Sequence, residues 1–447
     1  MNTQINRIKD KLATIKEYDK DYNVFGADSH EYTIGKIVSE QEIKDFEQTY
    51  NINLPEAYVA FLTQIGNANT SEEAYANSAA GPYYGIYPVG EGLDDLGVED
   101  VERFTSYPCL LRSDMTEEQW IALSESTREE GISDEVYYER MGNLFGGLLP
   151  IGTQGCAITT CLILTGEYKG RIVYLNEDYQ PIFAHEDSFL DWYERWLDEI
   201  ISGDLVSDNA GWFGYSIGGS SESLWESYKH TSQEAQQLTF LEGLLKKREL
   251  TSQLIEEIIQ EIPKATELVK ESLLTILSKN AFDKAIPFLE EQANTNLLHV
   301  LQMIHWYGKD KAYWLPLLKA KNKEVMDAET YRFYSYVLVS ATSDFGPLLT
   351  VGLASDNAEN RGQAIYTLGQ LNNKQQYVSS FINGLRDSNE RVVLNTLQAL
   401  NTVLDEQLLP VYKEVYQKYK ESSEDNYIVT NLKHRLGELG MEIGDLN

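Results

Sequence analysis

The sequence predicts two structural parts, an α+β domain in the first half of the chain and an all-α domain of repeated helical pairs in the second half. Two short apolar runs, 157–164 and 171–175, flank the turn-like stretch 166–170 and predict a β-hairpin. An amphipathic segment follows at once and predicts a helix that lies on a sheet. Beyond residue 224, apolar residues recur at helical spacing and hairpin signals are scarce. We therefore expect domains at 1–205 and 224–447, joined by a Gly/Ser-rich linker at 206–223.

The amphipathic segment carries an unusual number of aromatic residues on one face. Ser188 or Asp187 is the expected N-cap, and Gly203 the expected end. Such a face buries a large area. The two tryptophans could instead form a platform on which a ligand stacks, but their helical spacing favours the core. The residues of this face are Phe189, Trp192, Tyr193, Trp196, Leu197, Ile200 and Ile201.

Two more helices are predicted upstream. Ser39 to Glu42 is a capping-box sequence that opens a helix, and Leu54-Pro55-Glu56 opens a second helix that ends at Gly66. Residues 1–35 read as a helical lead-in, 66–92 as strand and loop, and 93–146 as polar loop and helix pieces inserted before the hairpin.

The order of these motifs resembles the SUKH superfamily, the Smi/Knr-type domain. The similarity covers roughly residues 36–203: helix, Leu-Pro-Glu, helix ending at Gly, then GLLPIGTQGC, the hairpin and SFLDWYERWL. The resemblance implies an α+β domain used for binding, most often in a bacterial immunity protein that neutralises a secreted toxin.

The charge of the chain restricts its partners. The net charge is −33, and residues 1–205 hold 14 Lys and Arg against 38 Asp and Glu, a net charge of −24. Such a domain repels nucleic acid and anionic membranes and attracts basic proteins. Acidity that serves only solubility is the alternative. The expected partner surface is formed by acidic residues of the insert: Asp94, Asp95, Glu99, Asp100, Glu102, Glu117 and Glu118.

The sequence favours a cytoplasmic location. The N-terminal segment is charged and lacks the apolar core of a secretory signal. No apolar run approaches the length of about 18 residues that a membrane span requires. The three cysteines, Cys109, Cys156 and Cys161, form no CxxC pair, so we expect reduced thiols, with Cys156 and Cys161 packed as small apolar groups.

Signals for catalysis are weak. Gly214-Tyr215-Ser216-Ile217-Gly218 matches the G-x-S-x-G pattern of serine hydrolases, but it lies in a Gly/Ser-rich segment without a buried strand before it. His299 and His305 are six residues apart, which does not place them on one helical face as metal ligands. No phosphate-binding or dinucleotide motif is present. We expect no enzyme activity, no cofactor and no metal.

The end of the chain contains an internal repeat. The pairs Gly352-Leu353 and Gly384-Leu385 lie 32 residues apart, and Arg361 and Arg391 lie 30 apart. This pattern resembles HEAT-type helical repeats, in which stacked helix pairs bury each other's apolar faces. A plain helical bundle is the alternative.

Together these observations predict a non-enzymatic immunity protein that occludes the active surface of a cognate toxin, which we expect to be basic. The alternative is a regulatory scaffold that binds its partner through the helical repeats. An esterase that uses Ser216 is a third hypothesis.

Overall fold

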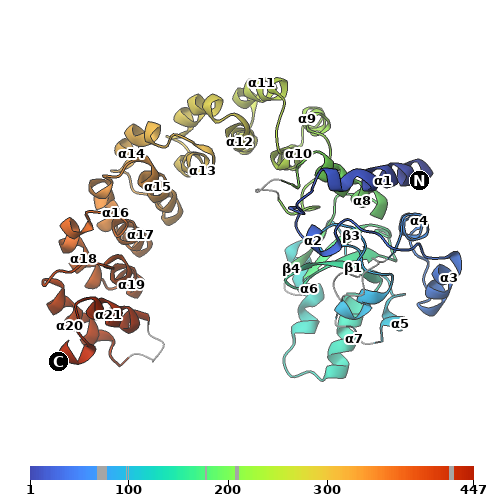
Figure 1. Cartoon of the computed structure of the whole chain (residues 1–447), viewed down its shortest axis with the longest axis horizontal. Helices are drawn as coiled ribbons and strands as arrows, with labels where there is room; N and C mark the ends of the chain where they lie inside the picture. The colour runs from blue at the N-terminus through green and yellow to red at the C-terminus, as the bar shows by residue number, and fades with distance from the viewer. Residues whose placement is uncertain are drawn as a thin grey trace. The chain divides into compact units, whose positions relative to one another are not determined.

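The computed structural model describes residues 1–67, 78–96, 98, 100–176, 179–206, 211–421 and 427–446. The chain divides into two compact units, Met1–Leu254 and Ile255–Asn447 (Figure 1). Within the described residues, no helix is both long and apolar enough to cross a membrane.

A four-stranded antiparallel sheet forms the centre of the first unit. Its strands are β1 (Leu148–Gly155), β2 (Ile158–Ile163), β3 (Ile172–Asn176) and β4 (Tyr179–Phe183), paired in the order β1-β2-β3-β4 (Figure 1). The predicted hairpin is confirmed as β2 and β3, in which Cys161 pairs with Val173. The sheet also contains β1, the GLLPIG stretch, and the short edge strand β4.

Side chains of alternate strand residues point to two different cores. On one face, Leu162 and Tyr174 pack with the helices α1 (Asn2–Thr14), α4 (Glu56–Gln64) and α8 (Phe189–Ile201). On the other face, Cys161 and Val173 pack with α5 (Val101–Phe104), α6 (Glu117–Ser124) and α7 (Asp134–Leu144). The predicted insert at 93–146 therefore covers the second face of the sheet, with Phe104, Trp120 and Met141 buried against it. The α+β fold predicted for this part is confirmed.

The local helix signals are realised as predicted. Ser39 and Glu42 form a capping box at the start of α3 (Glu40–Thr49). The Ser188 side chain accepts a hydrogen bond from the Asp191 amide and caps α8. All the aromatic residues on the apolar face of α8 are buried.

Residues 211–220 of the expected linker 206–223 pack into the first unit, and residues 221–223 already belong to helix α9 (Ser221–His230). Phe213 and Ser216 are buried, and the short helix α2 (Ala27–His30) contributes to the same core. Helices α9 (Ser221–His230) and α10 (Glu234–Lys246) also fall within the compact unit that ends at Leu254. The Gly and Ser residues of this segment thus allow close packing rather than free motion.

The rest of the chain is helical, as predicted. A non-helical backbone at Ala281 divides the long helix α12. The helices are α11 (Ser252–Glu261), α12 (Glu267–Gln292), α13 (Leu297–Tyr307), α14 (Leu315–Lys321), α15 (Ala328–Ala341), α16 (Thr350–Leu353), α17 (Ala358–Leu368), α18 (Val378–Leu385), α19 (Glu390–Ala399), α20 (Leu408–Tyr419) and α21 (Tyr427–Glu438).

Alternate helices of the second unit pack side by side. Each of α13, α15, α17 and α19 contacts the next odd-numbered helix, up to α21, while α18 contacts α20 (Figure 1). Asn357 and Asn389 occupy the same N-cap position on α17 and α19, and the Arg361 guanidinium joins one helical pair to the next through Asp387, at 2.7 and 2.9 Å. This stacking is compatible with the HEAT-like repeat, which remains an interpretation.

Candidate functional site

Three of the predicted acidic residues lie before and within α5. Asp95 is exposed on the 3-10 helix η2 (Glu91–Leu96), which packs on β1. The burial of the Tyr87 phenol raises its pKa, and the nearby Asp95 carboxylate raises it further. Asp100 is the exposed N-cap of α5, and its carboxylate lies 3.8 Å from the Arg103 guanidinium. Glu102 is exposed on the same helix.

Two others lie on the first turn of α6. Glu117 and Glu118 are exposed there, after a capping box formed by Thr116 and Gln119. Carboxylates at this position also stabilise the helix through its dipole. Helix α6 packs on β4, whereas η2 packs on β1. Glu117 and Glu118 therefore lie toward one edge of the sheet and Asp95 toward the opposite edge. Glu99 and the side chain of Asp94 lie outside the described part of the chain. A single surface made of all seven residues therefore remains a hypothesis.

A large groove, which the sequence did not indicate, lies along the polar face of α8. Its volume is about 840 Å³. The α8 residues Asp191, Glu194 and Asp198 line it, together with Lys247 and Glu249. Carboxylates outnumber cations along it, so the groove has the same sign of charge as the domain.

Helix α1 supplies cations to this groove. The Glu194 carboxylate accepts hydrogen bonds from Arg7 and Lys11, each at 2.8 Å, and Lys11 also lies 2.6 Å from Asp198. Burial by itself raises the pKa of Glu194, but the two cations outweigh it and hold this pKa at about 2. The N-terminal helix is thus fixed to the domain by charge as well as by its buried residues Ile5 and Ile8.

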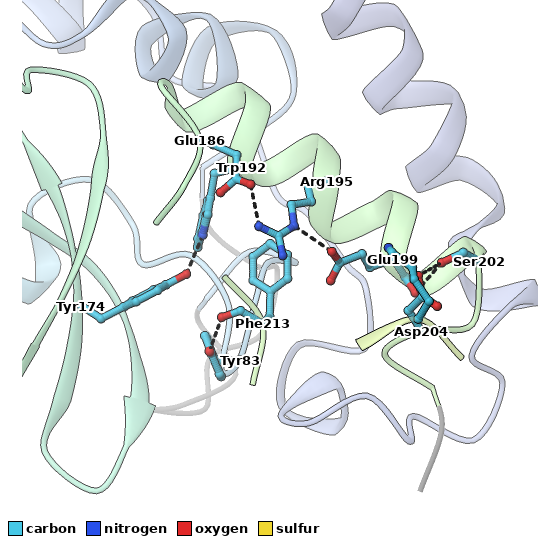
Figure 2. A network of polar contacts seen from close by, with 10 residues as sticks. Tyr83, Tyr174, Glu186, Trp192, Arg195, Glu199, Ser202, Asp204 and Phe213 are labelled. Carbon is cyan, nitrogen blue, oxygen red and sulfur yellow. Dashed lines mark hydrogen bonds and ion pairs between the residues drawn. The ribbon is translucent and has the colours of Figure 1, made fainter. Parts of the chain in front are cut away.

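A second polar network includes three residues that line the same groove, Glu186, Arg195 and Glu199 (Figure 2). The Arg195 guanidinium donates to Glu186 at 2.6 Å and to Glu199 at 2.7 Å, and it lies 5.2 Å from the centre of the Phe213 ring. Burial lowers the pKa of Arg195, yet Glu199 and Glu186 raise it overall. The network therefore holds a permanently charged, compensated arginine that orders the 211–220 segment.

The same network explains the glycines of the G-x-S-x-G match. A Cβ at Gly214, whose φ is +79°, would lie 2.0 Å from the Tyr174 hydroxyl, and a Cβ at Gly218 would lie 2.3 Å from Arg195 Nε. Ser216 between them is only 3% exposed, and residues 211–220 contain no strand. A nucleophile elbow instead presents its serine at an exposed strand-to-helix turn. The pattern is accounted for by packing.

The histidines and cysteines show structural roles. In α13, His299 Nδ1 lies 2.8 Å from Gln292 Oε1 and its Nε2 lies 2.9 Å from Thr275 Oγ1, which makes it a core histidine. Cys161 is buried as predicted, whereas Cys156 is exposed because the tight connection between β1 and β2 turns it outward, with φ at +50°. In the described residues, no three His, Cys, Asp or Glu side chains are grouped so that they could hold a metal ion.

The comparison with protein families matches the first unit. Residues 37–195 match the model of the SMI1 / KNR4 family (SUKH-1). No curated protein and no solved structure matches the chain. The matched range begins two residues before the capping serine of α3 and ends within α8, so it contains the whole sheet. A SUKH-1 domain, of the SMI1/KNR4 family, is therefore found at residues 37–195.

Proposed function

We propose that this chain is a non-enzymatic immunity protein whose first unit binds a basic toxin domain and occludes its active surface. The observation that carries the proposal is the net charge of −24 over residues 1–205, the region that contains the SUKH-1 domain. Immunity proteins are common in that family. A toxin that acts on a polyanion would bind the negatively charged surface of this domain as it binds its own negatively charged target.

The charges available to such a partner lie on described, exposed side chains. Asp191 lies on α8 and lines the groove, and Glu102 and Glu117 lie on α5 and α6, which cover the opposite sheet face. Exposed carboxylates raise the rate of encounter with a basic protein, and buried contacts then set the lifetime of the complex. Occlusion requires no chemistry from the immunity protein itself.

The proposal is tested by titrating the full chain with the toxin encoded beside its gene, at about 50 and about 500 mM salt. The screening length falls from about 14 to about 4 Å over this range, so affinity should fall at least about tenfold. Glu102→Lys and Glu117→Lys each reverse one exposed charge on a different part of the domain, and the one in the interface should slow association. Glu406→Lys, in the second unit, is the matched control. Affinity that does not change with salt would contradict the electrostatic mechanism.

One observation favours the alternative of a scaffold. Trp306, Tyr336 and Tyr366 are exposed on α13, α15 and α17, which pack one on the next. Exposed aromatic residues on successive helices are typical of protein-binding faces. If a Trp306→Ala, Tyr336→Ala variant loses its cellular partner while the charge reversals do not, the helical unit carries the function.

A further inference from the structure

An exposed aromatic recess lies in the first unit. Phe25 is 51% exposed and Trp212 is 54% exposed, and their ring centres are 5.2 Å apart. Tyr83 lies beneath them, 6.3 Å from Phe25 and 5.7 Å from Trp212. The recess has a volume of about 350 Å³, near the lower end of the range of about 300–1,000 Å³ for binding pockets.

The three segments that carry these rings are fixed to one another. A Cβ at Gly26, whose φ is +79°, would lie 2.3 Å from the Tyr83 carbonyl oxygen, so only glycine permits this contact. The Tyr83 hydroxyl donates to the Phe213 carbonyl at 2.7 Å, as Figure 2 shows. Tyr83 itself has a left-handed backbone, with φ at +58°. Strained, tightly held loops of this kind present side chains without a large entropic cost on binding.

A buried carboxyl group precedes one of these segments in the chain. The Asp19 carboxylate is 1% exposed and accepts hydrogen bonds from the Asn23 and Val24 amides and from the Tyr32 hydroxyl, at 2.7, 3.1 and 2.6 Å. Asn23 and Val24 line the recess. Among the residues that the structure describes, no Lys, Arg or His nitrogen forms an ion pair with Asp19, and these hydrogen bonds fix the start of the segment that carries Phe25.

We propose that this recess binds an arginine or lysine side chain of a basic protein partner. The faces of the exposed Phe25 and Trp212 rings attract a cation through their quadrupoles, and the net charge of −24 over residues 1–205 acts in the same direction. The proposal rests on the proposed function, because it identifies where the basic toxin would be anchored.

The test uses the full chain and a nona-arginine peptide, with the nona-citrulline peptide as the neutral control. Binding is measured by isothermal calorimetry at about 150 mM salt. Phe25→Ala and Trp212→Ala should each weaken arginine binding by about two- to fivefold, the size expected for a cation–π contact with a half-exposed ring. Trp212→Phe should recover most of the affinity. Tyr179→Ala, which removes a 70% exposed aromatic side chain from β4, is the matched control and should change nothing.

Two results would overturn the proposal: equal binding of citrulline and arginine peptides, or unchanged arginine binding by the Phe25 and Trp212 variants. A protection assay with the adjacent toxin separates this proposal from the immunity function. If the Trp212→Ala variant protects as well as the unaltered chain, immunity stands and the recess is not its anchor. If the recess binds arginine peptide but the unaltered chain gives no protection, the immunity function fails and the cation site stands.

Discussion

The titration of His30 should make the first unit lose stability between neutral pH and pH 4. The imidazole is buried on α2 beside Trp196, and its Nδ1 accepts the Tyr32 amide at 3.0 Å. Burial lowers the pKa of His30 from 6.5 to about 4. The unfolded chain therefore binds a proton over this interval that the folded unit does not, so stability falls as pH falls. At about 1.4 kcal/mol per pH unit, the loss reaches roughly 3 kcal/mol by pH 4.

The His30→Asn variant isolates this contribution. The asparagine oxygen can accept the Tyr32 amide in place of Nδ1 but does not titrate. We expect the variant to be less stable at pH 7.5, because of the cavity, yet to lose about 3 kcal/mol less than the unaltered chain on going to pH 4. Hydrogen exchange of the α8 amides reports the unfolding of this unit. Subtracting the pH profile of the variant from that of the unaltered chain removes the contribution of the carboxylates, which both proteins share. Parallel pH profiles for the two proteins would refute the reasoning.

Three further predictions concern packing and catalysis. Gly214→Ala should destabilise the first unit by at least about 2 kcal/mol, whereas Gly131→Ala, with a φ of +80° and no atom within 4 Å of the new Cβ, should cost about 1 kcal/mol, as measured by thermal melting. Equal costs would show that the Tyr174 contact is unimportant. Ser216→Ala should leave hydrolysis of an activated ester at its background rate, and a turnover that disappears in this variant would establish an esterase. Arg361→Ala should destabilise the second unit by about 1–3 kcal/mol in urea titrations, because it leaves the largely buried Asp387 unpaired. Arg386→Ala breaks a half-exposed pair with Glu414 and should cost clearly less, because solvent screens that pair.

The features of this protein that depend on neighbouring residues could be predicted without the structure. The capping box at Ser39 and the aromatic face of α8 could be read from the chain because helix periodicity and capping act over a few residues. The hairpin of β2 and β3 could be read for the same reason, and the charge of the first 205 residues needs no structure. The SUKH resemblance rested on the order of these local signals, and the family match at 37–195 agrees with it.

The contacts between distant segments could be known from the tertiary structure alone. It placed the acidic insert over the second face of the sheet and separated Asp95 from Glu117 toward opposite edges. It packed the Gly/Ser-rich segment against Arg195 and Tyr174, where the glycines are needed for space rather than for flexibility. It also brought Phe25 and Trp212 together from segments far apart in the chain. Such contacts are set by the mutual packing of whole elements, and the residues that make them show no periodicity or spacing that a sequence could display.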